Sequence, residues 1–164
     1  MMAEGFDEFF AGMLPRVIRV ARRVTGDPWL AEDVAVEALA RAHARWSRVG
    51  PLAWRDAWVL KVAAHEALRH ARRRLPATAS PPAADHADEV VLRAALVAAL
   101  VRLPRRQRAT VVLRYLCDLP EAEVAAALGV STGTVKTQIH RALATLRDVL
   151  GPEFEEPIAH GPTA

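Results

Sequence analysis

The chain has 164 residues, of which 52% are hydrophobic and 25% charged, and it carries a formal net charge of +3 at pH 7. Such a hydrophobic share excludes a disordered chain, and the abundance of alanine and leucine with few aromatic residues favours helices throughout. The single cysteine, Cys117, excludes an internal disulfide and indicates a reducing compartment.

Positive charge is concentrated in two blocks. Residues 1–75 carry 13 Lys or Arg against 9 Asp or Glu, and residues 102–150 carry 8 against 4, whereas the remaining stretches are net acidic. Two basic blocks suit two contacts with a polyanion. Arginine enrichment in a GC-rich genome is the alternative explanation, and composition alone leaves it open. No apolar stretch is long enough to span a membrane and no signal peptide is recognisable, so we expect a cytoplasmic protein without membrane contact.

Two helices are predicted first along the chain. Apolar residues recur at helical spacing over 6–25, where Pro15 is expected to bend or split the helix. Asp27 followed by proline is typical of a helix start, and the second helix is expected to run to about Trp46.

An acidic group lies in the first half of the second helix. It consists of Glu32, Asp33 and Glu37. The helix dipole favours acidic residues near a helix N-terminus, which is a purely structural explanation. A docking face for a basic partner is the functional one, and the residues alone leave both open.

A loop over 47–51 precedes a third, strongly basic helix over about 53–74. Its basic residues include Arg55, Lys61 and Arg69, and its tryptophans lie on the opposite, apolar side. Three such helices can form a compact bundle, and we favour core packing for the tryptophans. A basic helix with aromatic residues could also bind single-stranded DNA by stacking and phosphate neutralisation.

Neither a metal site nor a catalytic site is predicted. His65 and His70 tempt a zinc interpretation, but a spacing of five turns them about 500° apart on a helix, so they point in different directions. No nucleophile–base pair, phosphate-binding loop or paired-carboxylate pocket is recognisable. We therefore expect a protein without cofactor that is not an enzyme.

The stretch LPATASPPAADHA, at 75–87, cannot continue a helix and is the clearest boundary in the chain. Its thirteen residues reach at most about 45 Å. The predicted fold is therefore all-α, with two small helical domains over 1–74 and 88–150 joined by this Pro/Ala-rich linker. The acidic tail over 151–164 is expected to be disordered.

The second domain is predicted to contain four helices. One runs over 88–103, a second begins at Pro104 and continues to Leu116, and a third covers 121–128. Gly129 stands where the third helix must end, because glycine adopts the left-handed conformation without steric cost.

The last two helices form a predicted helix-turn-helix. Either Ser131 or Thr132 caps the final helix, whose apolar residues recur every three or four positions. Its opposite face suits the DNA major groove, where Gln and Arg can each make paired hydrogen bonds to base edges. An ordinary antiparallel helix pair with a solvated face is the alternative. The outward residues are Thr134, Lys136, Thr137, Gln138 and Arg141.

A family resemblance rests on three stretches. LPRRQRATVVLRYLCDLPEAEVAAALGVSTGTVKTQIHRALATLR resembles the promoter-reading C-terminal domain of a bacterial sigma factor of the extracytoplasmic-function group. TGDPWLAEDVAVEALARAHARW resembles the polymerase-binding helix of that family, and WRDAWVLKVAAHEALRHARRR resembles its DNA-melting helix. The likeness covers about residues 5–150, and the size is similar to that of short actinobacterial members.

The resemblance implies a protein that binds core RNA polymerase and directs it to promoter DNA, which it helps to open. An anti-sigma protein is a further candidate partner. By resemblance, the acidic group Glu32, Asp33 and Glu37 faces the polymerase clamp, and loop 47–53 with Arg55, Lys61 and Arg69 meets the melted minus-ten element. The minus-thirty-five element is assigned to Ser131, Thr132, Thr134, Lys136, Thr137, Gln138 and Arg141.

The chain departs from the family pattern at two positions. Val36 replaces a frequent glutamine in the polymerase-binding helix, which puts one clamp contact in doubt, and His65 replaces a frequent asparagine. Two other functions remain open. One is a helix-turn-helix regulator that acts without polymerase, although no dimerisation helix is recognisable. The other is a decoy that binds polymerase without using DNA.

Overall fold

The computed structural model describes residues 4–75 and 87–152, and these residues contain helices and no strand, which confirms the all-α prediction. Most of the predicted linker and of the predicted disordered tail lies outside the described residues. In chain order the helices are α1 Glu4–Thr25, α2 Pro28–Ala44, α3 Trp46–Val49, α4 Arg55–Arg73, α5 Ala87–Arg102, α6 Arg105–Val111, the π-helix η1 Val112–Leu116, α7 Glu121–Leu128 and α8 Thr132–Leu150.

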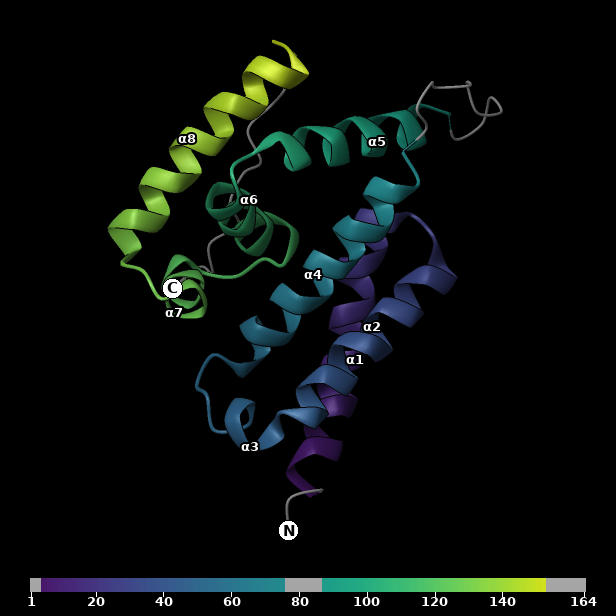
Figure 1. Cartoon of the computed structure of the whole chain (residues 1–164), viewed down its shortest axis with the longest axis vertical. Helices are drawn as coiled ribbons and strands as arrows, with labels where there is room; N and C mark the ends of the chain where they lie inside the picture. Colours follow the sequence, from purple (N-terminus) through teal and green to yellow (C-terminus); the bar gives the residue numbers. More distant parts are fainter. Residues whose placement is uncertain (1–3, 76–86, 153–164) are drawn as a thin grey trace.

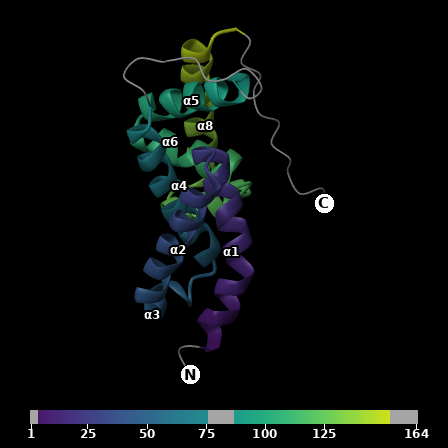
Figure 2. The same cartoon turned by 90° about the vertical axis from the view of Figure 1, so that its right-hand side faces the viewer.

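The long helices α1, α2 and α4 pack side by side into a bundle (Figures 1 and 2). Val17, Leu39 and Leu60, one from each helix, are fully buried at its centre. Pro15 was expected to bend or split the first helix, and the split is excluded because α1 is continuous from Glu4 to Thr25. Proline removes one backbone hydrogen bond from the helix. The buried side chains of Met13 and Val17, one before and one after Pro15, hold both parts of α1 against the bundle.

The start of α2 is capped as its sequence predicts. Asp27 Oδ1 accepts hydrogen bonds from the backbone N–H groups of Trp29 and Leu30, at 3.0 and 3.1 Å. Its other oxygen accepts one from Arg74 at the end of α4, at 2.7 Å. Asp27 therefore also joins the start of α2 to the end of α4.

The second helix ends at Ala44, close to the predicted end at about Trp46. The predicted loop over 47–51 was wrong in its first part, because Trp46–Val49 forms a separate helical turn, α3. The Trp46 ring packs against the rings of Phe6 and Phe9 in α1, with centroids 5.1 and 4.9 Å apart. This aromatic cluster stabilises the turn where local sequence indicated a loop.

The helix predicted over 104–116 changes its hydrogen bonding at Val112. Beyond that point it forms the π-helix η1, and the N–H of Cys117 donates to the carbonyl of Val112 at 3.0 Å. The buried Arg114 donates to the carbonyl of Leu119 at 3.1 Å and so supports the irregular exit. Asp118, just after η1, adopts a positive φ of 54°.

The helix-turn-helix formed by α7 and α8 is confirmed. Gly129 takes the left-handed conformation, with φ 66°, and ends α7. Of the two predicted caps Ser131 is used, because its Oγ accepts from the backbone N–H of Thr134 at 3.1 Å. The inner face of α8 is buried, and its side chains include Val135, Ala142 and Leu146.

The two halves of the chain are in contact. Helix α5 lies across one end of the bundle, and α4 touches α5, η1 and α7 (Figures 1 and 2). One hydrophobic core runs through both halves, from Val17 to Leu113 and Val124. The predicted domain boundaries stay a prediction. No helix in the described residues is long and apolar enough to cross a membrane.

Candidate nucleic-acid interface

The outer face of α8 presents three of the predicted DNA-reading residues to solvent. Lys136, Thr137 and Arg141 are exposed, and of these Lys136 makes only a long ion pair, 3.8 Å, to Glu121 of α7. His140 is also exposed one turn after Lys136, and the sequence interpretation missed it. Helical spacing from Lys136 was the signal that could have found it.

The remaining predicted residues of α8 and its cap differ in exposure. Thr134 and Gln138 are partly buried, and the Gln138 amide oxygen has no hydrogen-bond partner within the described residues. The Ser131 hydroxyl caps the helix and lies 2.9 Å from the Thr134 hydroxyl. Thr132 is exposed in the first turn. Among the predicted base-reading residues, Thr134 and Gln138 are therefore the least available to a partner.

The three predicted DNA contacts of α4 lie in different environments. Arg55 is exposed, donates to the Gly50 carbonyl at 3.1 Å and lies over the Phe9 ring. Arg69 is exposed and forms an ion pair with Glu66. Lys61 is partly buried and donates to the carbonyl of Ala127 in α7 at 3.1 Å. Burial, together with the nearby charge of Arg105, holds the pKa of Lys61 below its usual value.

A surface hollow of about 530 Å³ lies beside the loop that was predicted to meet melted DNA. It is open to solvent, and Arg55 stands at its edge, which suits contact with a phosphate or an unstacked base. The residues that line it come from α1, from α3 and the loop after it, and from the start of α4: Gly5, Glu8, Trp46, Ser47, Gly50, Pro51 and Arg55.

The outer face of α2 combines acidic and apolar side chains. Glu32 and Asp33 are exposed, as predicted for a docking face. Trp29 and Val36 share that face at helical spacing and are 78% and 56% exposed. Trp29 was not among the predicted site residues. An exposed tryptophan bordered by charges is typical of a protein-binding surface.

Glu37 differs from the other two acidic residues because it is paired with another side chain of α2. Arg41 donates to Glu37 at 2.6 Å and to the buried Glu66 of α4 at 2.7 Å. Glu66 also pairs with Arg69. The resulting ion network joins α2 to α4, and it makes Glu37 a structural residue as well as a candidate contact.

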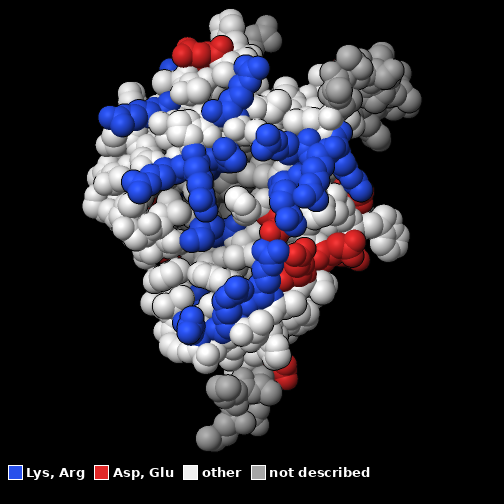
Figure 3. Space-filling model, in the orientation of Figure 1, with Lys and Arg blue, Asp and Glu red and all other residues white. Residues whose placement is uncertain are grey.

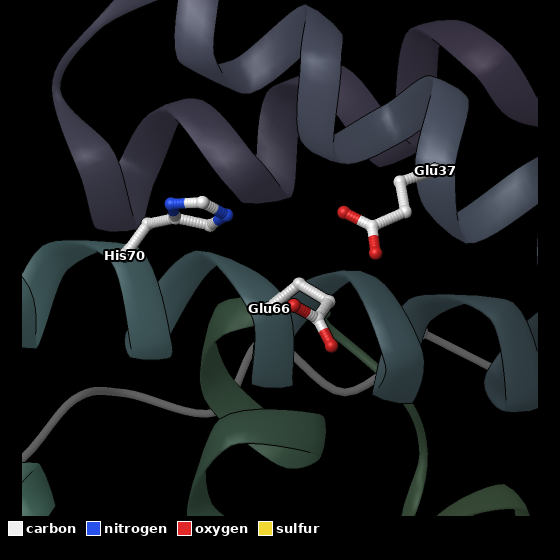
Figure 4. Close-up of side chains that lie close together, drawn as sticks. All are labelled: Glu37, Glu66 and His70. Carbon is white, nitrogen blue, oxygen red and sulfur yellow. The ribbon is translucent and has the colours of Figure 1, made fainter.

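Glu37, Glu66 and His70 point toward one another, and their ligand atoms lie within 4.8 Å (Figure 4). Three such groups could in principle hold a metal ion. Here Arg41 and Arg69 already neutralise the two carboxylates, so the cluster is explained as an ion network without a metal. The absence of a cofactor stays a prediction.

Replacing Arg41 by glutamine is expected to lower the free energy of unfolding by about 2 kcal/mol. Removing the partner of a buried carboxylate costs about 3–5 kcal/mol when both groups are buried. The Glu66 side chain is 5% exposed, but Arg41 is 38% exposed and Arg69 remains as a partner, so a smaller loss is expected. Urea unfolding followed by circular dichroism measures it.

The same network predicts acid sensitivity. Burial alone raises the pKa of the Glu66 carboxyl, but the hydrogen bond and charge of Arg41 outweigh it and hold that pKa below its ordinary value of 4.5. The ionised pair therefore contributes stability above about pH 4.5, and this contribution is lost as the pH falls through the folded-state pKa. Arg41→Gln should flatten this pH dependence. An unchanged profile would contradict the assigned role of Arg41.

Basic and acidic side chains occupy different parts of the face that Figure 3 shows. Lys and Arg side chains are spread over α4 and the C-terminal helices beside it, and acidic side chains gather over α2 (Figure 3). A broad basic face favours a polyanion through sequence-independent attraction. The acidic side of α2 suits a basic protein surface instead.

Two family models match the chain. The one described as Sigma-70 region 2 matches residues 9–75, which span α1 to α4, and the one described as Sigma-70, region 4 matches residues 93–146, which include the helix-turn-helix. The N-terminal half of the chain is thus similar to region 2, and the C-terminal half is similar to region 4.

Known proteins resemble the chain over most of its length. The RNA polymerase sigma-E factor of Streptomyces coelicolor is 36% identical over 151 residues, which cover 88% of this chain and 85% of the relative. The ECF RNA polymerase sigma factor SigM of Mycobacterium tuberculosis is 31% identical over 151 residues, which cover 89% and 77%.

A solved structure shares the fold. It is that of the sigma factor RpoE in complex with the anti-sigma factor NepR from Bartonella quintana. The match has a TM-score of 0.54 at 22% identity and covers 91% of this chain and 98% of that chain. A likeness at this level of identity bears on the fold alone.

Proposed function

This chain belongs to the sigma-70 family, in its extracytoplasmic-function group, and on that premise we propose how its surfaces serve an alternative sigma factor, which binds core RNA polymerase and directs it to promoters. The exposed face of α2 docks on core polymerase. The outer face of α8 reads the minus-thirty-five element, and the basic side of α4 with the adjoining loop holds the melted minus-ten element.

The observation that carries this assignment is the outer face of α8. Its N-terminus is capped by Ser131, its inner face is buried, and Lys136, Thr137 and Arg141 project outward from one rigid helix. Such a helix fits the major groove, where Arg can make a bidentate hydrogen bond to guanine. Lysine adds phosphate contacts that fix the helix on the duplex.

Promoter opening is assigned to the basic side of α4 and the adjoining loop. Unpairing DNA costs stacking energy, and a hollow bordered by Trp46 and Arg55 can recover part of it by holding an extruded base. Each contact is weak alone, but two sites on one chain bind together more tightly than either does separately. We further propose that the chain acts by binding alone, without catalysis of its own, in the cytoplasm where polymerase works.

The first test is co-elution of the purified chain with core RNA polymerase on a sizing column. We expect a stable one-to-one complex, which then selects promoters from a random DNA pool in run-off transcription. Binding to duplex DNA without any complex with polymerase would favour a free regulator. A complex that forms but selects no promoter would favour a decoy.

A further inference from the structure

We propose that a small hollow between α4 and the segment formed by α6 and η1 (Figure 1) binds the phosphate group of a small free anion, such as inorganic phosphate. Four basic side chains line this hollow, two from each side: Lys61 and His65 of α4, and Arg105 and Arg108 of α6. We call it the basic hollow. The proposal concerns a ligand that neither polymerase binding nor promoter reading requires.

The basic hollow is built from one face of each helix. On α4, His65 follows Lys61 by four residues, so the two side chains share a face. On α6, Arg108 follows Arg105 by three residues, with the same result. Helix α4 packs against η1, which continues directly from α6, and this contact brings the two faces together. Packing of segments far apart in the sequence therefore gathers the four basic side chains.

The charge of the basic hollow is not balanced by the protein. Within the described residues, none of its four basic side chains forms an ion pair with a carboxylate. Glu66 interacts electrostatically with His65, but it is already paired with Arg41 and Arg69. Like charges without a counter-charge repel one another, and an anion that enters between them relieves that repulsion. The basic hollow is therefore a favourable place for an anion.

Two of the four basic side chains are held away from bulk water, unlike those of an ordinary basic surface. Lys61 is partly buried, and its burial, together with the nearby charge of Arg105, holds its pKa below the usual value. Arg108 is partly buried as well, and one of its guanidinium nitrogens donates to the carbonyls of Val101 and Leu103, at 3.2 and 3.0 Å. Its Nε is buried without a partner within the described residues. A buried N–H without an acceptor is costly, so Arg108 is positioned as a donor to a ligand.

The size of the basic hollow matches one tetrahedral oxoanion. Its volume is about 50 Å³. A cavity needs about 10–15 Å³ for each water-sized group, so the hollow holds about four such groups, which is the number of oxygen atoms in phosphate. Its apolar walls are the buried side chains of Leu68, Val112 and Leu113, beside which charges attract more strongly than in water. His65 and Arg105 are exposed, so an ion can enter from solvent.

A free anion fits the basic hollow better than the backbone of a nucleic acid does. A backbone phosphate carries one negative charge and is bonded to a sugar on both sides. Free phosphate bears up to two charges near neutral pH and has no such substituents, and the small hollow accommodates little beyond the oxoanion itself. Lys61 is also a predicted DNA contact of α4, so a phosphate group held here would compete with DNA for its ammonium.

Titration of the whole isotope-labelled chain with inorganic phosphate at constant ionic strength, followed by the NMR shifts of its amides, tests the site. We expect saturable shifts in α4 and α6, with half-saturation at about 1 mM, because a few charge-assisted hydrogen bonds must offset the freedom lost on binding. Arg105→Gln should weaken binding about tenfold. Arg106→Gln is the matched control, because Arg106 is exposed on the same helix and does not line the hollow, and it should change the affinity less than twofold. The same spectra show that each variant is folded.

Dimethyl phosphate is the second ligand, because it reproduces the double ester and the single charge of a nucleic-acid backbone. We expect it to bind at least about tenfold more weakly than inorganic phosphate. Equal affinities would assign the basic hollow to backbone phosphate and overturn the proposal of a free anion. Equal losses in Arg105→Gln and Arg106→Gln would reduce the effect to net charge and overturn it too, as would shifts that do not saturate. Neither titration contains polymerase or promoter DNA, so its failure leaves the sigma-factor assignment standing.

Discussion

Trp29→Ala is expected to weaken binding to core RNA polymerase by about thirtyfold or more, which corresponds to about 2 kcal/mol. Trp29 is 78% exposed on the α2 face that also carries Glu32, Asp33 and Val36. A large aromatic ring left in water within a charged border contributes most of its free energy only when a partner covers it. Titration of labelled chain with core polymerase, followed by fluorescence anisotropy, measures the loss.

The control is Leu92→Ala in α5, which removes another side chain that is strongly exposed, at 69%. We expect that variant to bind polymerase as the parent chain does. Equal losses for the two variants would indicate a general effect of surface apolar residues. Full affinity in Trp29→Ala would exclude the α2 face as the docking surface.

Arg141→Ala is expected to lower run-off transcription from a selected promoter by about tenfold to a hundredfold. The exposed guanidinium projects from the outer face of α8, and one bidentate base contact discriminates by about 1–3 kcal/mol. Complex formation with core polymerase should be unchanged, because α8 lies away from the proposed docking face of α2. The measurement is single-round transcription with reconstituted polymerase.

Arg102→Ala is the matched control, since it removes the same charge from an exposed position in α5, outside the helix-turn-helix. A loss confined to Arg141→Ala, with selection relaxed at particular base pairs, is the expected signature of direct readout. Equal losses in both variants would mean that Arg141 contributes only net charge. No loss in either would favour the decoy.

The sequence was sufficient wherever local chemistry determines structure. Asp27, Gly129 and Ser131 act as the caps and stop that their residue types indicate, because each effect is confined to one turn of helix. It was insufficient where a distant residue decides. The helical turn at Trp46 depends on rings from α1, and the continuity of α1 through Pro15 depends on buried neighbours.

In the candidate site, too, features set by nearby residues could be predicted and features set by distant residues could not. Spacing placed Lys136 and Arg141 on the outer face of α8, since helical periodicity alone determines that face. It also placed Gln138 there, but the structure partly buries that residue. The pairing of Glu37 with Arg41 follows an i, i+4 spacing within α2, a signal that the sequence does contain. The bonds of Arg41 to Glu66 and of Lys61 to the Ala127 carbonyl could not be read from the sequence, because each joins two different helices.

The π-helix η1 also has a consequence for how insertions and deletions are tolerated. A π turn contains one residue more than the α turn it replaces, and the bond from Cys117 N–H to the Val112 carbonyl spans that extra residue. Deleting one residue between Val112 and Leu116 would restore α-helical bonding and rotate everything that follows by about 100° about the helix axis. The Leu116 carbonyl, which accepts a hydrogen bond from Arg23 of α1 at 2.9 Å, would then turn away, and α7 and α8 would leave in another direction. The orientation of α8 is therefore set by the number of residues in this turn.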